Sequence, residues 1–270
     1  MLRRAALIVS LCAWVLPSAA FASNCYAFVQ GVPGVRYVAL DGPILAAGAR
    51  EVTITYVGHS TFRIETEGGV VIATDFFGAS GEGRLPDVVT MNKAHETHFT
   101  DFPNPDIPNV MRGWNPKGGP AKHLLELNDV VIRNVTTDIR GWGSPEKDAN
   151  SIFVFEVADL CIGHLGHLHH DLTEAHHALL GRLDIVMAPV DGSFTLDIGT
   201  MTALLKRLKA RLVLPMHAFG QYSLERFLDG MRDEFDVAIH DGRTIKVSLE
   251  TLPSRPTVLV LPTVFPLDYD

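Results

Sequence analysis

Seven of the twelve histidines of this chain lie in three short segments, and each segment directly follows an apolar run that reads as a strand. These histidines are His95 and His98, then His164, His167, His169 and His170, and finally His217. Neutral imidazole is the commonest protein ligand for zinc and similar metals. Ligands from separate loops meet only when the chain folds, so the spacing predicts a metal site. The alternative is a histidine-rich surface with incidental affinity for metals.

The expected elements place these segments at the ends of strands. Alternating apolar and polar residues predict a β-hairpin between residues 51 and 75. Further strands are expected at 88–91, 129–135, 151–163, 184–189 and 211–216, a last hairpin at 236–249, helices at 173–181, 198–210 and 224–234, and loops at 101–119 and 138–150. Strands first, then alternating helices and strands, indicate an α/β fold, either two sheets with helices packed outside or a mixed α/β layer fold. Because ligand sites gather at strand ends, polar residues there are the main candidates: Asp75, Asn92, His164, Asp191 and His217.

Five segments resemble the metallo-β-lactamase-fold hydrolases, in the order in which that family has them. They are YVGHSTFRIE at 56–65, VIATD at 71–75, HLGHLHHDLT at 164–173, APVDGSFTL at 188–196 and LPMH at 214–217. The nearest branch contains L-ascorbate-6-phosphate lactonase and N-acyl-phosphatidylethanolamine phospholipase D. The resemblance covers residues 51 to 249, and it implies an αββα sandwich, with two mixed β-sheets between outer helices.

The metal-binding signature of that family is altered in this chain. The family has His-x-His-x-Asp-His after a strand, whereas residues 93–98 read KAHETH. Lys93 therefore stands at the first histidine position and Thr97 at the aspartate position. By the same comparison, His167 replaces the bridging aspartate, and Asp138 is the only candidate near the place of the third-motif histidine.

The resemblance implies one metal ion instead of two. His98, His167 and His217 would form a three-histidine site with one open position, which His95 and His164 could join or support. At the other family site only His95 remains, with Asp138 as a candidate partner. The ammonium of Lys93 would disfavour a second cation. Zinc is the expected metal, although copper and nickel also suit imidazole. Asp75 is expected to orient a ligand histidine, and His59 either lines the pocket or holds its turn.

Hydrolysis at such a site would use metal-activated water. With Thr97 at the aspartate position, the proton acceptor could be Asp191, Asp138 or His170, and Lys93 could stabilise an oxyanion. The structural alternatives are a solvent-facing Lys93 and a turn-forming Asp191.

Three functions remain open on the sequence alone. The first is a metal-dependent hydrolase of a small ester, lactone or phosphodiester. The second is a non-catalytic metal-binding protein or degenerate enzyme of the same fold. The third and weakest is a redox metal protein, since Met216 and Cys161 adjoin the metal segments.

The N-terminus predicts export. Arg3 and Arg4, an apolar stretch and Ala20-Phe21-Ala22 match a cleaved signal peptide over residues 1–22. An N-terminal extension at 23–50, a domain at 51–252 and a C-terminal tail at 253–270 would follow. The mature chain is then expected to be secreted or periplasmic, with no membrane attachment, and there Cys25 and Cys161 could pair or stay as thiols. A net charge of −8 without a basic run argues against binding to nucleic acid or to anionic membrane surfaces. The family resemblance implies a small-molecule substrate.

Overall fold

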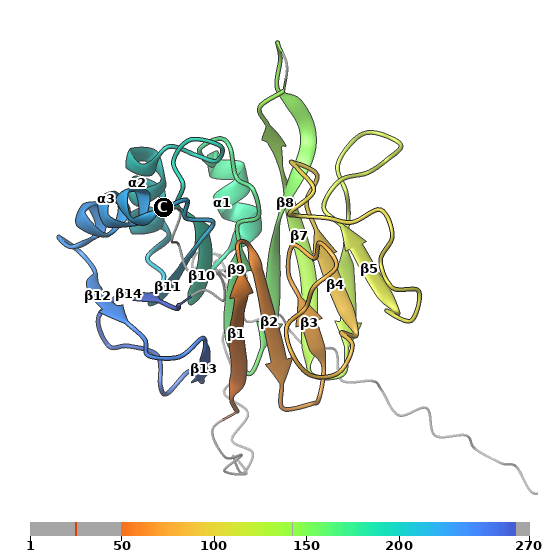
Figure 1. Cartoon of the computed structure of the whole chain (residues 1–270), viewed down its shortest axis with the longest axis horizontal. Helices are drawn as coiled ribbons and strands as arrows, with labels where there is room; N and C mark the ends of the chain where they lie inside the picture. Colours follow the sequence, from red (N-terminus) through yellow and green to blue (C-terminus); the bar gives the residue numbers. More distant parts are fainter. Residues whose placement is uncertain (1–24, 26–49, 142, 263–270) are drawn as a thin grey trace, which may run out of the picture.

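The computed structural model describes residue 25, residues 50–141 and residues 143–262. Two β-sheets pack face to face in this part of the chain, and three helices cover the outer face of the larger sheet (Figure 1). The expected signal peptide and most of the expected N-terminal extension lie outside the described residues. Within the described ranges, no helix is long and apolar enough to cross a membrane.

The six-stranded sheet has the order β13-β1-β2-β3-β4-β5. Its strands are β1 (Val52–Gly58), β2 (Thr61–Thr66), β3 (Val71–Ala73), β4 (Val88–Met91), β5 (Asn109–Arg112) and β13 (Thr244–Val247). β1, β2 and β3 form an antiparallel meander, whereas β3, β4 and β5 run parallel. The predicted hairpin at the start of the domain is confirmed.

The eight-stranded sheet has the order β12-β14-β11-β10-β9-β8-β7-β6. Its strands are β6 (Leu124–Leu127), β7 (Val130–Ile139), β8 (Glu146–Val157), β9 (Leu160–His164), β10 (Ile185–Pro189), β11 (Leu212–Met216), β12 (Asp236–Ile239) and β14 (Thr257–Val260). β9, β10, β11 and β14 are parallel, so their carboxyl ends meet at one edge.

The helices are α1 (Glu174–Leu180), α2 (Ile198–Leu208) and α3 (Gln221–Met231). α1 begins at Thr173, whose side chain accepts a hydrogen bond from the His176 amide, as expected of a threonine N-cap. Asp197 caps α2 in the same way. Apolar residues of the helices pack on the outer face of the larger sheet.

Alternation along the strands builds the main core between the sheets. β1 buries every second residue, and its buried side chains Val52, Ile54 and Tyr56 meet Phe153 and Phe155 of β8 in one cluster. A second core lies between the larger sheet and the helices. The predicted α/β fold with two mixed sheets is therefore confirmed.

Three local expectations differ from the structure. β5 lies within the stretch 101–119 that reads as loop, and β7 and β8 continue into the stretch 138–150. The strands around Asp241-Gly242 do not form a hairpin, since β12 pairs with β14 in one sheet and β13 pairs with β1 in the other. β14 also places part of the expected C-terminal tail inside the sheet. The strands around Asp241-Gly242 separate because each has a pairing partner distant in sequence. β5 pairs with β4, and β7 and β8 pair with each other as one long hairpin, although the composition of these stretches is typical of loops.

Candidate metal centre

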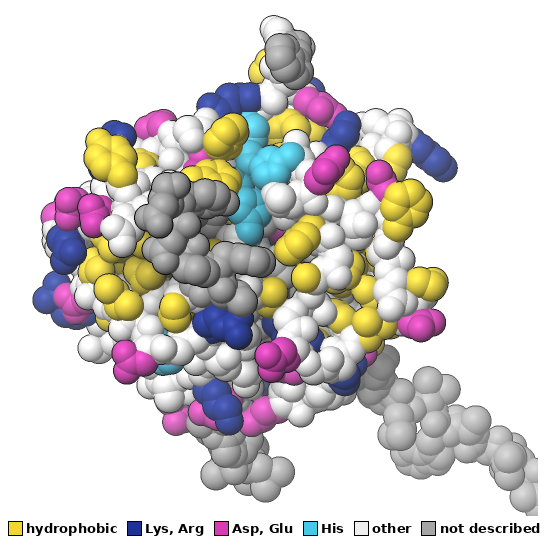
Figure 2. Space-filling model, viewed as in Figure 1, with side chains coloured by type: hydrophobic (Ala, Val, Ile, Leu, Met, Phe, Trp, Pro, Cys, Tyr) yellow, Lys and Arg dark blue, Asp and Glu magenta, His cyan; other side chains and the backbone are white. Residues whose placement is uncertain are grey.

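The histidine segments converge where strands of both sheets end. His59 follows β1, His95 and His98 follow β4, His167 follows β9, and His217 follows β11. Figure 2 shows histidine side chains together in a hollow of the surface, with hydrophobic side chains nearby. The convergence inferred from strand order is therefore present in the fold.

Four imidazoles could bind one metal ion together. His59, His95, His98 and His217 each offer a ring nitrogen, and these nitrogens lie within 4.8 Å of one another. The rings of His98 and His217 are 5.0 Å apart between centres, and those of His95 and His98 are 4.6 Å apart. His59, expected to line the pocket or hold a turn, thus lies in the group itself.

Asp75 orients His98. Nδ1 of His98 donates to Oδ2 of Asp75 over 2.5 Å, and the Asn92 amide donates to Oδ1 over 2.8 Å. All three residues are fully buried. Since Nδ1 of His98 carries the proton, Nε2 has a free lone pair, and it is buried without a hydrogen-bond partner among the described residues. A carboxylate behind a histidine in this way is the usual support of a metal ligand.

Asp191 stands behind His217 in a similar way. Nδ1 of His217 lies 3.3 Å from Oδ1 of Asp191, although not in good hydrogen-bond alignment. Nε2 of His217 is buried and, within the described ranges, has no partner. The same carboxylate accepts from the amides of Ser193, Phe194 and Thr195 and from the Ser193 and Thr195 hydroxyls. It is well placed to orient His217, and its lone pairs are largely occupied.

Backbone conformation is unusual at three of these residues. His59, Asp75 and His217 have φ values of 53°, 40° and 55°, in the left-handed region that non-glycine residues seldom adopt. The carbonyl of His59 accepts from the His217 amide over 2.7 Å and from the Tyr56 hydroxyl over 2.7 Å. Such strain persists only where surrounding contacts hold it, and it concentrates at functional sites.

Thr97 links two histidines of the group. Its hydroxyl lies 2.7 Å from Nδ1 of His95 and 2.8 Å from Nε2 of His59. Nε2 of His95 lies 2.9 Å from Nε2 of His167. The residue at the signature aspartate position therefore orders imidazoles by hydrogen bonding.

His167 is bonded at both ring nitrogens. In addition to the contact with His95, its Nδ1 lies 2.5 Å from Nε2 of His169, and its amide donates to Asn150 over 2.8 Å. Nδ1 of His169 accepts from the Arg140 amide over 2.8 Å. His167 thus adjoins the four-histidine group by a hydrogen-bond contact with His95, and its ring centre also lies 4.6 Å from that of His98 and 4.9 Å from that of His217.

Two other predicted ligands do not join this group. His164 accepts from the Gly166 amide at Nδ1 and therefore donates from Nε2 to the Ser60 carbonyl over 2.8 Å, so it ties the loop to β1–β2. Asp138 accepts from the Lys147 ammonium over 2.6 Å and from the Asp148 amide over 3.0 Å. Both have local partners, in place of the expected ligand roles.

The proposed catalytic residues also have defined positions. Lys93 forms an ion pair with Glu146 at the surface, so the ammonium has a carboxylate partner. His170 is half-buried, and its Nε2 has no partner in the described part of the chain. No contact of His170 tests its expected role as a proton acceptor.

Burial favours the neutral form of His59, His95, His98, His167 and His169 by lowering the pKa of each ring. It lowers the pKa of His59 to about 2, with the charges of His217, His98 and His95 adding to the effect. It lowers the pKa of His169 to about 4 and shifts those of His95, His98 and His167 downward. Burial raises the pKa of Asp75 to about 6. Burial also raises that of Asp191, but the nearby His217 and the hydrogen bonds from Thr195 and Ser193 outweigh it and hold the pKa of Asp191 well below its usual range. Neutral rings and ionised carboxylates are what a metal cation requires.

Several residues support the histidines in ways that the sequence did not predict. Thr97, Asn92, Asn150, His169 and Arg140 hold the histidines or their carboxylates in place. Asn92 had one signal, since it follows a buried strand directly. The contacts of the others depend on side-chain geometry that spacing does not encode.

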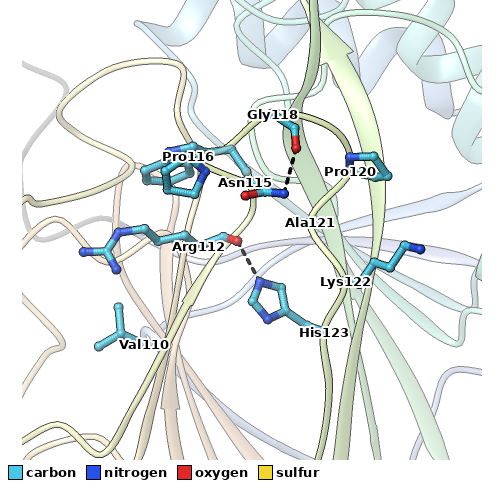
Figure 3. Close-up of a pocket in the computed structure, with 10 residues that line it drawn as sticks. Val110, Arg112, Asn115, Pro116, Gly118, Pro120, Ala121, Lys122 and His123 are labelled. Atoms are coloured by element: carbon cyan, nitrogen blue, oxygen red, sulfur yellow. Dashed lines mark hydrogen bonds between the residues drawn. The ribbon is translucent and has the colours of Figure 1, made fainter.

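Cavities border the histidines on two sides. One, of about 580 Å³, is lined by His59, Val57, Phe77, Ala79 and Leu85 together with glycine-rich backbone. Another, of about 540 Å³, is lined by His95, Thr97, Lys93, Glu96 and Phe99. A third, of about 660 Å³, lies beside the edge strand β5 and holds none of the grouped histidines (Figure 3). The first two are therefore the cavities that a ligand of the metal centre would enter.

Comparison with known proteins agrees with this geometry. A family model described as a beta-lactamase superfamily domain matches residues 53–217. A UPF0173 metal-dependent hydrolase of Salinibacter ruber is 27% identical over 222 residues, covering 70% of this chain and 95% of that protein. A second relative with the same name, from Anaeromyxobacter dehalogenans, is 26% identical over 253 residues, covering 79% of this chain and 88% of that protein.

Solved structures show a similar fold. A Thermotoga maritima protein of the metallo-beta-lactamase superfamily has a TM-score of 0.56 and 26% identity, covering 79% of this chain and all of that one (100%). A metallo hydrolase of the archaeon Ignicoccus hospitalis has a TM-score of 0.50 at 18% identity, covering 74% of this chain and 99% of that one. At 18% identity, the similarity to the Ignicoccus hospitalis protein concerns the fold alone.

Proposed function

This chain belongs to the beta-lactamase superfamily, and we propose that it is an exported metal-dependent hydrolase of an uncharged ester or lactone with an apolar acyl side. One observation supports metal binding most directly. Four ring nitrogens lie within 4.8 Å of one another, and Nε2 atoms of His98 and His217 are buried without a partner in the described ranges. A buried nitrogen lone pair without a donor is costly unless something binds it. The residues present therefore fit a metal ion.

The metal would be held by His98 and His217, with His95 and His59 beside them. A divalent cation such as zinc supplies Lewis acidity at a site of this kind. Asp75 and Asp191 orient the first two rings, and Thr97 orients the other two. The names of the relatives support this assignment, and the choice of zinc rests on the chemistry of imidazole ligands.

The cavity beside His59 supports the substrate class. Val57, Phe77, Ala79 and Leu85 line it, and its one cation, Arg84, is paired with Asp87. At about 580 Å³ it has the size of a small-molecule site. An apolar acyl or alkyl group would bury its surface there. A phosphodiester would bring a negative charge to a lining without an unpaired cation, so an uncharged ester or lactone is favoured.

Two aromatic residues extend the apolar surface at the metal centre. The ring of Phe219 lies 4.8 Å from that of His217 and 5.6 Å from that of His59. Phe194 packs against Phe219 at 5.7 Å. Both phenylalanines are largely exposed, at 60% for Phe194 and 49% for Phe219. Exposed aromatic rings at a site usually serve contact with a ligand.

A disulfide supports export. Cys25 is bonded to Cys161 of β9, and such bonds persist in oxidising compartments such as the periplasm. Fractionation of cells that express the full chain, with detection of the mature protein in the periplasm or medium, tests this part. Retention of the whole chain in the cytosol would contradict it.

Metal content and turnover test the hydrolase. We expect about one zinc per purified chain by elemental analysis, lost in a His98→Ala, His217→Ala variant. Zinc-loaded protein should cleave p-nitrophenyl hexanoate and simple lactones with a higher kcat/KM than bis(p-nitrophenyl) phosphate. No metal, even after zinc is supplied, would refute the metal site. Bound metal without turnover on any ester would favour the second candidate, a non-catalytic metal-binding protein.

The apolar cavity has its own test. Phe77→Ala should raise KM for p-nitrophenyl hexanoate about tenfold, as expected for loss of one apolar contact of about 1–3 kcal/mol, and should change KM for the acetate little. Phe102→Ala is the control, because Phe102 is 92% exposed and lines neither cavity at the histidines. Equal effects of both variants, or a preference for the phosphodiester, would contradict the substrate class.

A further inference from the structure

A continuous line of hydrogen bonds runs from the end of β7 into the metal centre. The Arg140 amide donates to Nδ1 of His169 over 2.8 Å. Nε2 of His169 lies 2.5 Å from Nδ1 of His167, and Nε2 of His167 lies 2.9 Å from Nε2 of His95. Nδ1 of His95 lies 2.7 Å from the Thr97 hydroxyl. Each ring uses both of its nitrogens in this line.

The first donor decides the direction of every bond that follows. A peptide N–H can only donate, so Nδ1 of His169 has no proton and the proton of this ring is on Nε2. That proton points at Nδ1 of His167, which therefore accepts, and His167 has its own proton on Nε2. His95 in turn accepts at Nε2 and donates from Nδ1 to Thr97. With one proton on each neutral ring, these hydrogen bonds specify which nitrogen holds it.

His167 is therefore protonated on the nitrogen that faces the centre. His98 is the opposite case, because its Nδ1 donates to Asp75 and leaves the Nε2 lone pair free. His217 resembles His98, with Nδ1 beside Asp191 and Nε2 unpartnered within the described ranges. A ring nitrogen that holds a proton cannot bind a metal.

We propose that His167 is not a metal ligand but a neutral hydrogen-bond donor to the substrate, with His169 and the Arg140 amide as the positioning residues that keep its proton on Nε2. The inference rests on the metal-binding part of the proposed function. Once the lone pair of His95 is used by a metal, the N–H of His167 loses its present acceptor. It is then available to the carbonyl oxygen of an ester or lactone, where negative charge develops during hydrolysis.

The guanidinium of Arg140 fixes the start of the line. It donates to the carbonyls of Ser193, Phe194 and Thr195, in the loop that also holds Asp191, and Nε lies 3.3 Å from Nδ1 of His169. The end of β7 is thereby tied to the loop after β10. If His167 instead had its proton on Nδ1, then His169 would have to turn a second donor toward the Arg140 amide. Two facing donors are unfavourable.

Nitrogen NMR of the metal-free protein tests the inference directly. With ¹⁵N-labelled histidine, long-range ¹H–¹⁵N spectra report which ring nitrogen holds the proton. We expect His167 and His169 as Nε2–H tautomers and His98 as the Nδ1–H tautomer. His167 found as the Nδ1–H tautomer would overturn the proposal. In His169→Phe the single Nε2–H state of His167 should become a mixture, whereas His170→Phe, which changes the neighbouring ring outside the line, should leave it intact.

Metal affinity and kinetics separate the donor from a ligand. By competition with a chelator, His167→Gln should bind zinc within about threefold of the unchanged protein, while His98→Gln should bind it at least 100-fold more weakly. Equal losses in the two variants would overturn the proposal. On a cleaved ester, His167→Leu should lower kcat about 100-fold with little change in KM, as for loss of one oxyanion donor, and His167→Gln should lower it less. The spectra and the zinc affinities decide the role of His167 even if no ester is cleaved.

Discussion

At the scale of single residues, two carboxylates determine which histidine nitrogens can bind a metal. Asp75 and Asp191 lie behind His98 and His217. Asp75 accepts the Nδ1 proton of His98 and leaves its Nε2 unprotonated, and Asp191, 3.3 Å from Nδ1 of His217, favours the same arrangement there. The side-chain amide of Asn92 donates to the second oxygen of Asp75 and helps to hold this carboxylate in place. The chemistry of the centre thus depends on residues that do not touch the ion.

Asp75→Asn should weaken metal binding about 10–100-fold, the usual effect of losing a carboxylate behind a ligand histidine. The asparagine would have to turn its own amide donor toward either His98 or Asn92. Competition with a chelator measures the change. Asp138→Asn is the control, since Asp138 is bonded to Lys147 and Asp148, and it should stay within twofold of the original affinity. If both variants lose affinity equally, the loss is a general charge effect.

The buried imidazoles also predict how stability depends on pH. Burial lowers the pKa of His59 to about 2 and that of His169 to about 4, whereas the unfolded value is near 6.5. Below pH 6.5 the unfolded chain therefore binds more protons, and each group removes at most about 1.4 kcal/mol of stability per pH unit. Its contribution is present above pH 6.5 and is lost as pH falls toward the folded pKa. Asp75 has the opposite effect between pH 6 and 4, because burial raises its pKa to about 6 and the folded chain then binds the extra proton. Asp75 is one group, whereas several histidines lower the stability as pH falls.

Urea unfolding of the metal-free protein at pH 7.5 and pH 5.0 measures this dependence. The free energy of unfolding should be lower at pH 5.0. His59→Gln should reduce the difference between the two pH values, because one buried titrating ring is gone. Equal stability at both values would show that these histidines are protonated in the folded protein.

At the scale of elements, the loop after β9 packs tightly against two buried asparagine side chains beside the metal centre. Gly166 follows β9 with a φ of 62°, and a Cβ placed there would lie 2.3 Å from Nδ2 of Asn92 and 2.5 Å from Oδ1 of Asn150. Those amides support Asp75 and the His167 backbone. The loop after β9 therefore needs a glycine for both conformation and space.

Gly166→Ala should lower both stability and metal affinity. The left-handed backbone alone costs about 1–2 kcal/mol for alanine, and displacement of two buried amides adds to it. Gly69→Ala is the matched control, because Gly69 has a φ of 81° and no atom near its Cβ position. Gly69→Ala should lose stability through its left-handed backbone alone and should keep the original metal affinity. An equal loss of metal affinity in both variants would contradict the role of this packing in metal binding.

At the scale of the whole molecule, the disulfide joins the N-terminal side of the chain to the middle of the larger sheet. Cys25 and Cys161 are 136 residues apart in sequence, and both are buried. A bond that closes so long a loop restricts the unfolded chain strongly. The amide of Arg182 also donates to the Cys25 carbonyl over 2.7 Å.

Replacing both cysteines by serine should lower the free energy of unfolding by about 2–5 kcal/mol. Thermal or urea unfolding measures it. A reductant should destabilise the original chain by a similar amount and leave the double variant unchanged. A reductant effect on the double variant would point to another cause.

The sequence by itself determined the class of fold, most strand positions and the chemistry to expect. Alternating apolar residues, the Thr173 cap and the histidines after strands are local signals, because periodicity, capping and spacing can be read from residues close together in the chain. They predicted a histidine-rich metal centre, and His95, His98 and His217 lie together in the fold. The resemblance pointed to the superfamily that the comparisons show.

Only the tertiary structure decided which side of each ring faces the centre. His59 joins the group, while His164 turns both of its nitrogens to the backbone and Asp138 turns to Lys147. β12 and β13 enter different sheets although a turn sequence joins them. Hydrogen bonding and strand pairing depend on groups that are distant in sequence, so spacing could place a histidine near the site but not orient its lone pair.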